Sequence, residues 1–216
     1  MKIEINVPTT LNDITLGQYQ KFLKIAENNE DSSFLDAKMI EIFCGIPLSD
    51  SYKLKMSSVN TILGILDELL NTQPKHQAKF KMDGVNYGFI PDLNEMSLGE
   101  YIDLDNHIGD WEKMHYAMNV LYRPIDTDKA GRYNIVEYEV GNEEKMKDMP
   151  LGVVLGSIVF FWNLGKELSM HTLNSLDKQE MGIYLQHPTS QENGVGINQF
   201  MDSLTGTLQG LKISLN

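Results

Sequence analysis

The stretch LNDITLGQY, residues 11–19, recurs without a gap as LNEMSLGEY, residues 93–101. Five of the nine positions are identical, and the other four are conservative changes. Each copy contains a Ser/Thr-x-x-Gln/Glu capping box, in which two side chains three residues apart satisfy each other's backbone amides at a helix start. The repeat therefore predicts that helices begin at Thr15 and Ser97. Together with the other predicted helices, these two make the chain mainly helical.

Each copy also follows a segment that is typical of a β-strand. Residues 2–7 alternate apolar and polar side chains before Pro8, and the second copy follows an apolar run that ends near Pro91. We interpret the shared unit as a strand, a short loop and a capped helix, near residues 3–26 and 85–108.

Two explanations of the repeat stay open. Capping boxes are common, so similar local physics can arise twice; alternatively, the unit is a duplicated half or a recurrent docking element. Identity at positions outside the cap favours the second explanation. The candidate partner contacts are therefore Leu11, Asn12 and Gly17 with their counterparts Leu93, Asn94 and Gly99.

A hairpin precedes the second copy. Asp83-Gly84 is a strong turn signal between the β-prone residues 80–82 and 85–90. We expect this hairpin to join residues 2–7 in a small antiparallel sheet, with helices packed around it. The fold class predicted is α+β, mainly α-helical.

The remaining helices are predicted from periodicity and from start and stop signals. Residues 34–44 end at Gly45, and residues 58–71 begin with a serine cap. Residues 110–122 carry the most regular apolar stripe and end at Arg123-Pro124. After a loop at 126–131, residues 133–140 are β-branched and aromatic and predict a strand.

The C-terminal third begins with the most apolar run, residues 151–164, which should form a buried helix from Pro150. It is too short for a membrane span, which needs about 20 residues. Residues 186–196 predict a mobile loop, and residues 197–211 an amphipathic segment whose Phe200, Leu204 and Leu208 are candidate partner contacts. We treat residues 1–216 as a single domain.

Composition excludes several classes of protein. The net charge is -12, with 18 Lys and Arg against 30 Asp and Glu, which argues against nucleic-acid binding. The single cysteine, Cys44, lies in an apolar run and reads as a buried hydrophobe. The N-terminus alternates and therefore does not resemble a signal peptide.

No motif of catalysis stands out. Glu112 and His115 have one copy of the spacing that di-iron bundles use twice, and His115 falls on an apolar stripe, so we expect a core histidine. The cluster Asp103, Asp105, His107 and Asp110 lacks the glycine and glutamate of a calcium loop. We expect no catalytic residue, metal or cofactor, and Arg123 should form an ion pair or anchor a partner.

Three short stretches carry a family resemblance. Residues 8–20 (PTTLNDITLGQYQ), 121–124 (LYRP) and 160–168 (FFWNLGKEL) resemble proteins of tailed bacteriophages, particularly crAss-like and related phages of Bacteroidetes. The resemblance implies a virion or tail-assembly protein with no catalytic residues to transfer.

The functional hypothesis is therefore a non-enzymatic structural component of the neck, tail or internal cargo. It would act in the host cytoplasm during assembly, and then in the virion, by contacts with other phage proteins or with copies of itself. The alternatives are a tail-assembly chaperone absent from the mature particle and, third, a metal-dependent enzyme using Glu112 and His115.

Overall fold

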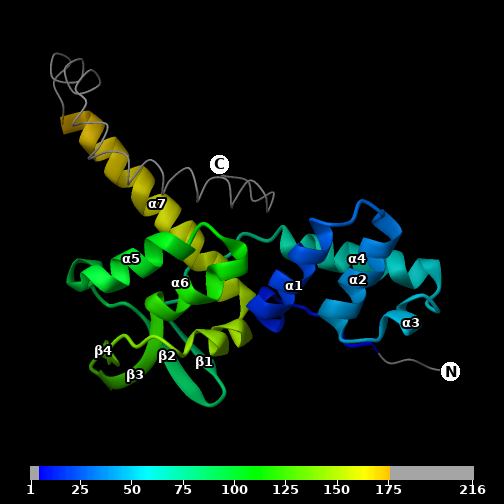
Figure 1. The fold of residues 1–216 in the computed structure, drawn as a ribbon, viewed down its shortest axis with the longest axis horizontal. Helices are drawn as coiled ribbons and strands as arrows, with labels where there is room; N and C mark the ends of the chain where they lie inside the picture. The colour runs from blue at the N-terminus through cyan, green and yellow to red at the C-terminus, as the bar shows by residue number, and fades with distance from the viewer. Residues whose placement is uncertain (1–4, 176–216) are drawn as a thin grey trace.

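The computed structural model describes residues 5–175, with side chains to residue 164, and has the predicted α+β architecture (Figure 1). Four helices from the first third of the chain lie together at the right of Figure 1, and α5, α6 and the sheet lie at the left. The long helix α7 (Leu151–Ser175) begins between the two groups. Residues 186–196 and the segment with Phe200, Leu204 and Leu208 lie outside the described residues.

The first group consists of α1 (Leu16–Ala26), α2 (Ser32–Cys44), α3 (Leu48–Ser51) and α4 (Met56–Leu70). Gly45 ends α2 with a φ of 69°, the left-handed conformation that glycine adopts readily, as predicted. The predicted serine cap of α4 is wrong. That helix begins two residues earlier, after Lys55, and has no side-chain cap.

In the part of the chain that the structure describes, the sheet has four antiparallel strands in the order β1-β2-β3-β4. The predicted hairpin is confirmed as β1 (Lys79–Met82) and β2 (Val85–Phe89). Asp83 and Gly84 both have positive φ, which suits the twist of a two-residue hairpin turn. Ala130 and Gly131 repeat this turn between β3 (Tyr122–Lys129) and β4 (Arg132–Ile135).

Two predicted elements are wrong. Residues 5–7 form no strand and lie outside the sheet, and Ile5 and Val7 pack against the hydrophobic core. The helix predicted for residues 110–122 is a 3-10 turn, η3 (Trp111–Lys113), followed by α6 (Met114–Leu121). The chain then enters β3 directly at Tyr122, through the region predicted as a helix end and a loop.

The predicted strand at residues 133–140 is confirmed only as far as Ile135, where β4 ends. Residues 136–140 continue without regular structure, and a 3-10 helix, η4 (Glu143–Asp148), leads into α7. The first ten residues of α7 are almost all buried, so the predicted core helix is confirmed. None of the described helices is long and apolar enough to cross a membrane.

One connected hydrophobic core joins α1, α2, α4, α6, the sheet and the first half of α7. A buried polar link fixes the sheet to α7: the Tyr122 hydroxyl lies 2.8 Å from Ser157 Oγ and donates to the Gln77 carbonyl at 2.7 Å. Pairing of these buried groups removes the cost of leaving them without hydrogen bonds. The sheet and α7 therefore form a common base for the helices.

Candidate functional site

Both predicted capping boxes are present. At α1, Gln18 N donates to Thr15 Oγ1 at 3.2 Å, and Thr15 N donates to Gln18 Oε1 at 2.9 Å. At α5 (Leu98–His107), Glu100 N and Ser97 N make the same two bonds with Ser97 Oγ and Glu100 Oε2, at 3.3 and 2.7 Å. The two helices therefore start in the same way.

The fourth residue of each box also attaches its helix to the rest of the fold. Gln18 Nε2 donates to the Ile42 carbonyl at 2.9 Å. Glu100 Oε1 instead accepts from Arg123 Nη2 at 2.8 Å, in a largely buried ion pair. Burial by itself raises the pKa of Glu100, but the hydrogen bonds from Ser97 and the charge of Arg123 together hold it below its ordinary value.

The first helix start is covered by residues that lead into α7. Leu16 N donates to the Met149 carbonyl at 2.9 Å, and Leu151 N donates to the Ile14 carbonyl at 2.8 Å. These two bonds form an isolated antiparallel bridge between Thr15 and Pro150. Only Met149 and Pro150, between η4 and α7, are extended, and they pair with the chain at the point where α1 begins.

Two large side chains of the first copy are buried at this helix start. Leu16 is 0% exposed and Tyr19 is 5% exposed. A Cβ on Gly17 would lie 3.2 Å from both the Cβ and the carbonyl oxygen of Lys147, so glycine permits the close approach. The predicted contacts Leu11 and Asn12 also lie here, against Gly152 of α7.

The second helix start has no such cover among the described residues. Leu98 is 75% exposed, Tyr101 54% and Ile102 47%, and their spacing of three and four places them on one stripe of α5. A Cβ on Gly99 would have no heavy atom within 4 Å. We call Leu98, Gly99, Tyr101 and Ile102 the α5 face.

Two backbone groups at this second start also lack a partner among the described residues. The counterparts of Leu16 N and the Ile14 carbonyl are Leu98 N and the Met96 carbonyl, and neither makes a hydrogen bond within residues 5–175. Unpaired polar groups beside an exposed apolar stripe are the features that a docking extended segment would satisfy.

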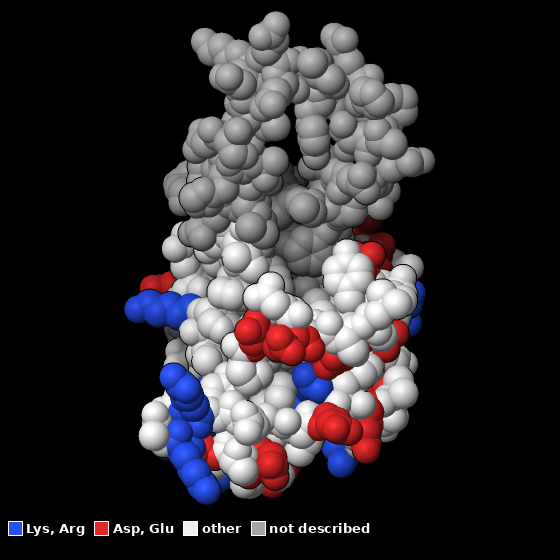
Figure 2. Space-filling model, turned by 90° about the vertical axis from the view of Figure 1, so that its left-hand side faces the viewer, with Lys and Arg blue, Asp and Glu red and all other residues white. Residues whose placement is uncertain are grey.

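The surroundings of the α5 face are acidic. Residues 92–107 contain five Asp or Glu and no Lys or Arg. Asp92, Glu95 and Asp105 form no ion pair with any residue that the structure describes. Figure 2 shows the left-hand end of the molecule in Figure 1, where acidic side chains gather among uncharged ones.

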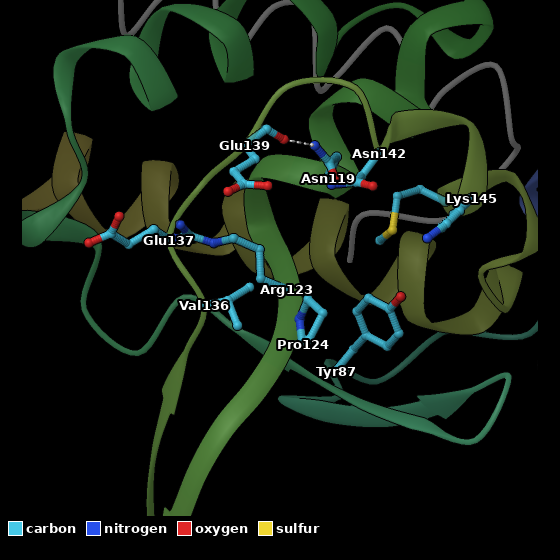
Figure 3. A pocket seen from close by; sticks show the side chains of 10 residues that line it. Tyr87, Asn119, Arg123, Pro124, Val136, Glu137, Glu139, Asn142 and Lys145 are labelled. Atoms are coloured by element: carbon cyan, nitrogen blue, oxygen red, sulfur yellow. Dashed lines mark hydrogen bonds between the residues drawn. The ribbon is translucent and has the colours of Figure 1, made fainter.

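Arg123, a predicted partner contact, lines a hollow of about 390 Å³ beside the sheet (Figure 3). Its guanidinium is paired with Glu100, and its Nε is buried without a hydrogen-bond partner in the described part of the chain. Lys145 adds a second positive charge to the lining, while Glu137 and Glu139 add negative ones. This mixture of charges selects no single class of small ligand.

The two residues of the metal hypothesis have different side-chain partners. The exposed Glu112 pairs with Lys24 at 3.1 Å. His115 is buried; its Nδ1 lies 3.2 Å from Gln20 Nε2, and its Nε2 lies 3.5 Å from Glu144 Oε1. Burial, followed by the nearby Lys147 charge, lowers the pKa of His115 despite the opposing glutamates.

Three other titratable candidates have local partners or are buried. Asp103 accepts a hydrogen bond from the Tyr138 hydroxyl, and Asp110 caps η3 through Glu112 N. Cys44 is buried, which raises its pKa to about 11. Within the described residues, His, Cys, Asp and Glu form no group of three that could hold a metal ion.

Sequence reasoning found this site only in part. It named Gly99, which lies on the α5 face, and Leu93 and Asn94, which lie on the turn before α5; there Asn94 bonds to Asp92, and Leu93 is half-buried. It missed Leu98, Tyr101 and Ile102. Their apolar spacing was a signal, but the matching Leu16 and Tyr19 are core residues, so the same pattern suits burial equally well.

Comparison with models of protein families, with curated proteins and with solved structures gives no match.

Proposed function

We propose that this protein is a non-enzymatic component of a tailed bacteriophage that works by binding other phage proteins. The observation that carries the proposal is the α5 face: three large apolar side chains stay exposed at a helix start whose twin is buried. Exposed apolar groups that cluster on one stripe are typical of protein-binding surfaces. The bacteriophage assignment rests on the resemblance of residues 8–20, 121–124 and 160–168.

The arrangement favours a binding role over catalysis. Among the described residues, the buried polar groups Glu100, His115 and Tyr122 are all engaged in contacts that stabilise the fold. The α5 face is apolar and is flanked by free backbone groups, and such a surface binds a polypeptide segment in preference to a small substrate.

Mass spectrometry of purified particles tests the proposal. Phage particles from a host that produces this chain are purified by density gradient, and the protein is quantified against the major capsid protein. We expect the protein at a fixed, reproducible ratio to the capsid protein. Presence in infected cells but absence from particles would overturn the structural assignment in favour of an assembly chaperone.

A further inference from the structure

We propose that the α5 face docks a lysine-bearing apolar segment of a partner protein that is extended where it meets the start of α5, through the same antiparallel bridge that Pro150 makes at the start of α1. The inference rests on the proposed binding function and names the chemistry of the partner. The first helix start is the template, because that site shows which kind of segment this sequence motif accommodates.

The template sets the backbone geometry of docking. At α1, the bridge uses one N–H and one C=O that flank the capping residue Thr15. At α5 the equivalent N–H of Leu98 and C=O of Met96 flank Ser97 and are free within the described chain. An incoming segment can therefore form the same pair of hydrogen bonds, which gives main-chain affinity in the manner of strand addition.

The template also sets the side chains of the partner. Met149 and Leu151, on either side of the bridging Pro150, are buried at α1 and supply apolar surface there. Leu98 and Tyr101 need the same kind of contact at α5, since they match the buried Leu16 and Tyr19. Apolar residues on both sides of the bridging residue are therefore required in the partner.

Gly99 permits the close approach that the template requires. At Gly17 the neighbouring backbone comes within 3.2 Å of the position of a Cβ, and at Gly99 that space is open. Within the described residues nothing demands glycine there, because no heavy atom lies within 4 Å of that Cβ position. A docked backbone that passes close to Gly99 would require the absence of a Cβ there.

Charge selects the kind of segment. Asp92, Glu95 and Asp105 leave the surroundings of α5 acidic and without ion pairs to described residues. The template segment carries lysines at Lys145 and Lys147, just before its bridge. A basic residue before the bridge would therefore be attracted to α5, more strongly at low salt.

A peptide titration tests the proposal with the intact chain. The probe is a fluorescent peptide with the template sequence KMKDMPLGVV, residues 145–154, and binding is followed by anisotropy. We expect a Kd on the order of 10 μM to 1 mM, as is typical of a small interface. A peptide with glutamate in place of both lysines should bind more weakly, and the difference should shrink at high salt.

Two variants place binding on the α5 face. Leu98→Asp should weaken binding at least about tenfold by removing apolar contact, and Gly99→Gln should do the same by filling the approach path. Gly64→Gln on α4 is the matched control, because a Cβ at Gly64 also meets nothing within 4 Å. Because all three sites are exposed, the variants should have a melting temperature that is unchanged or slightly raised.

Three outcomes would overturn the proposal. The first is no binding at millimolar peptide, and the second is binding that Leu98→Asp and Gly99→Gln leave intact. The third is self-association of the pure protein that Leu98→Asp abolishes in sedimentation, since a second copy would then occupy the α5 face. If the peptide fails to bind while the protein is found in particles, this inference fails and the proposed function stands.

Discussion

The starts of α1 and α5 share nine aligned residues but have opposite environments. Both have complete capping boxes, and both are attached to the fold through the last residue of the box. Leu16 and Tyr19 of α1 are buried, and the residues that enter α7 bond to the start of this helix, whereas Leu98 and Tyr101 of α5 are exposed. Capping chemistry thus determines where a helix begins, and the neighbouring chain determines whether its apolar face is core or surface.

The largest difference between the copies should come from the leucine after the cap. Leu16→Ala is expected to lower the free energy of unfolding by about 2–5 kcal/mol, as for other fully buried leucines. Leu98→Ala should change it by less than about 0.5 kcal/mol, because its side chain is in solvent. Urea unfolding followed by circular dichroism measures both; equal costs would show that α5 is covered as α1 is.

The caps themselves should behave alike. Thr15→Ala and Ser97→Ala are each expected to cost about 1 kcal/mol, because each change removes one side-chain acceptor from a helix start. Thermal unfolding measures both variants. If both left the melting temperature untouched, the capping account of the repeat would be wrong.

The paired glycines should respond in opposite directions. Gly99→Ala is expected to raise the free energy of unfolding by about 0.5 kcal/mol, since alanine reduces the entropy of the unfolded chain and meets no atom. Gly17→Ala should lower it by about 1 kcal/mol, because the new Cβ presses on Lys147. A gain in stability for both variants would mean that the segment over α1 is loosely held.

The smallest effect concerns pH, because only the α5 box can titrate. The folded pKa of Glu100 lies below its ordinary value, so its stabilising contribution is complete above the ordinary carboxyl range and is lost as the pH falls through the lowered pKa. Glu100→Gln should therefore flatten the fall in melting temperature between about pH 6 and pH 3. Glu95→Gln, at an exposed site, is the control. If it flattened the fall in melting temperature equally, the pH effect could not be assigned to the capping box of α5.

Local signals in the sequence predicted local structure well. The capping boxes, the Asp83-Gly84 turn, the Gly45 helix end and the start of α7 at Pro150 each depend on a few neighbouring residues, and all are confirmed. The confirmed fold class follows from these elements, since amphipathic helices and a hairpin must bury their apolar faces together.

Predictions that depended on distant partners were less successful. Residues 5–7 have a strand pattern, but β2 pairs with β3 instead, and Pro124 lies within β3 opposite Tyr87. The helix through residues 110–122 was overextended because Tyr122 continues the apolar stripe of α6 while it pairs with Phe89. Pairing across the sheet overrode helical periodicity at that residue.

The candidate site was predictable only as a repeated motif. The sequence marks Gly17 and Gly99 as equivalent, yet nothing local shows that Lys147 approaches the first and that no described atom approaches the second. Likewise, Arg123 was expected to form an ion pair, but its partner Glu100 belongs to the capping box of another helix. Such contacts follow from the tertiary arrangement.

Amide hydrogen exchange at two residues can show whether the start of α1 is covered and the start of α5 is open. The account predicts that the Leu16 amide, bonded to Met149, is protected, and that the Leu98 amide exchanges freely until the KMKDMPLGVV peptide is added and then becomes protected. Protection of Leu98 in the free protein, or free exchange at saturating peptide, would contradict the account.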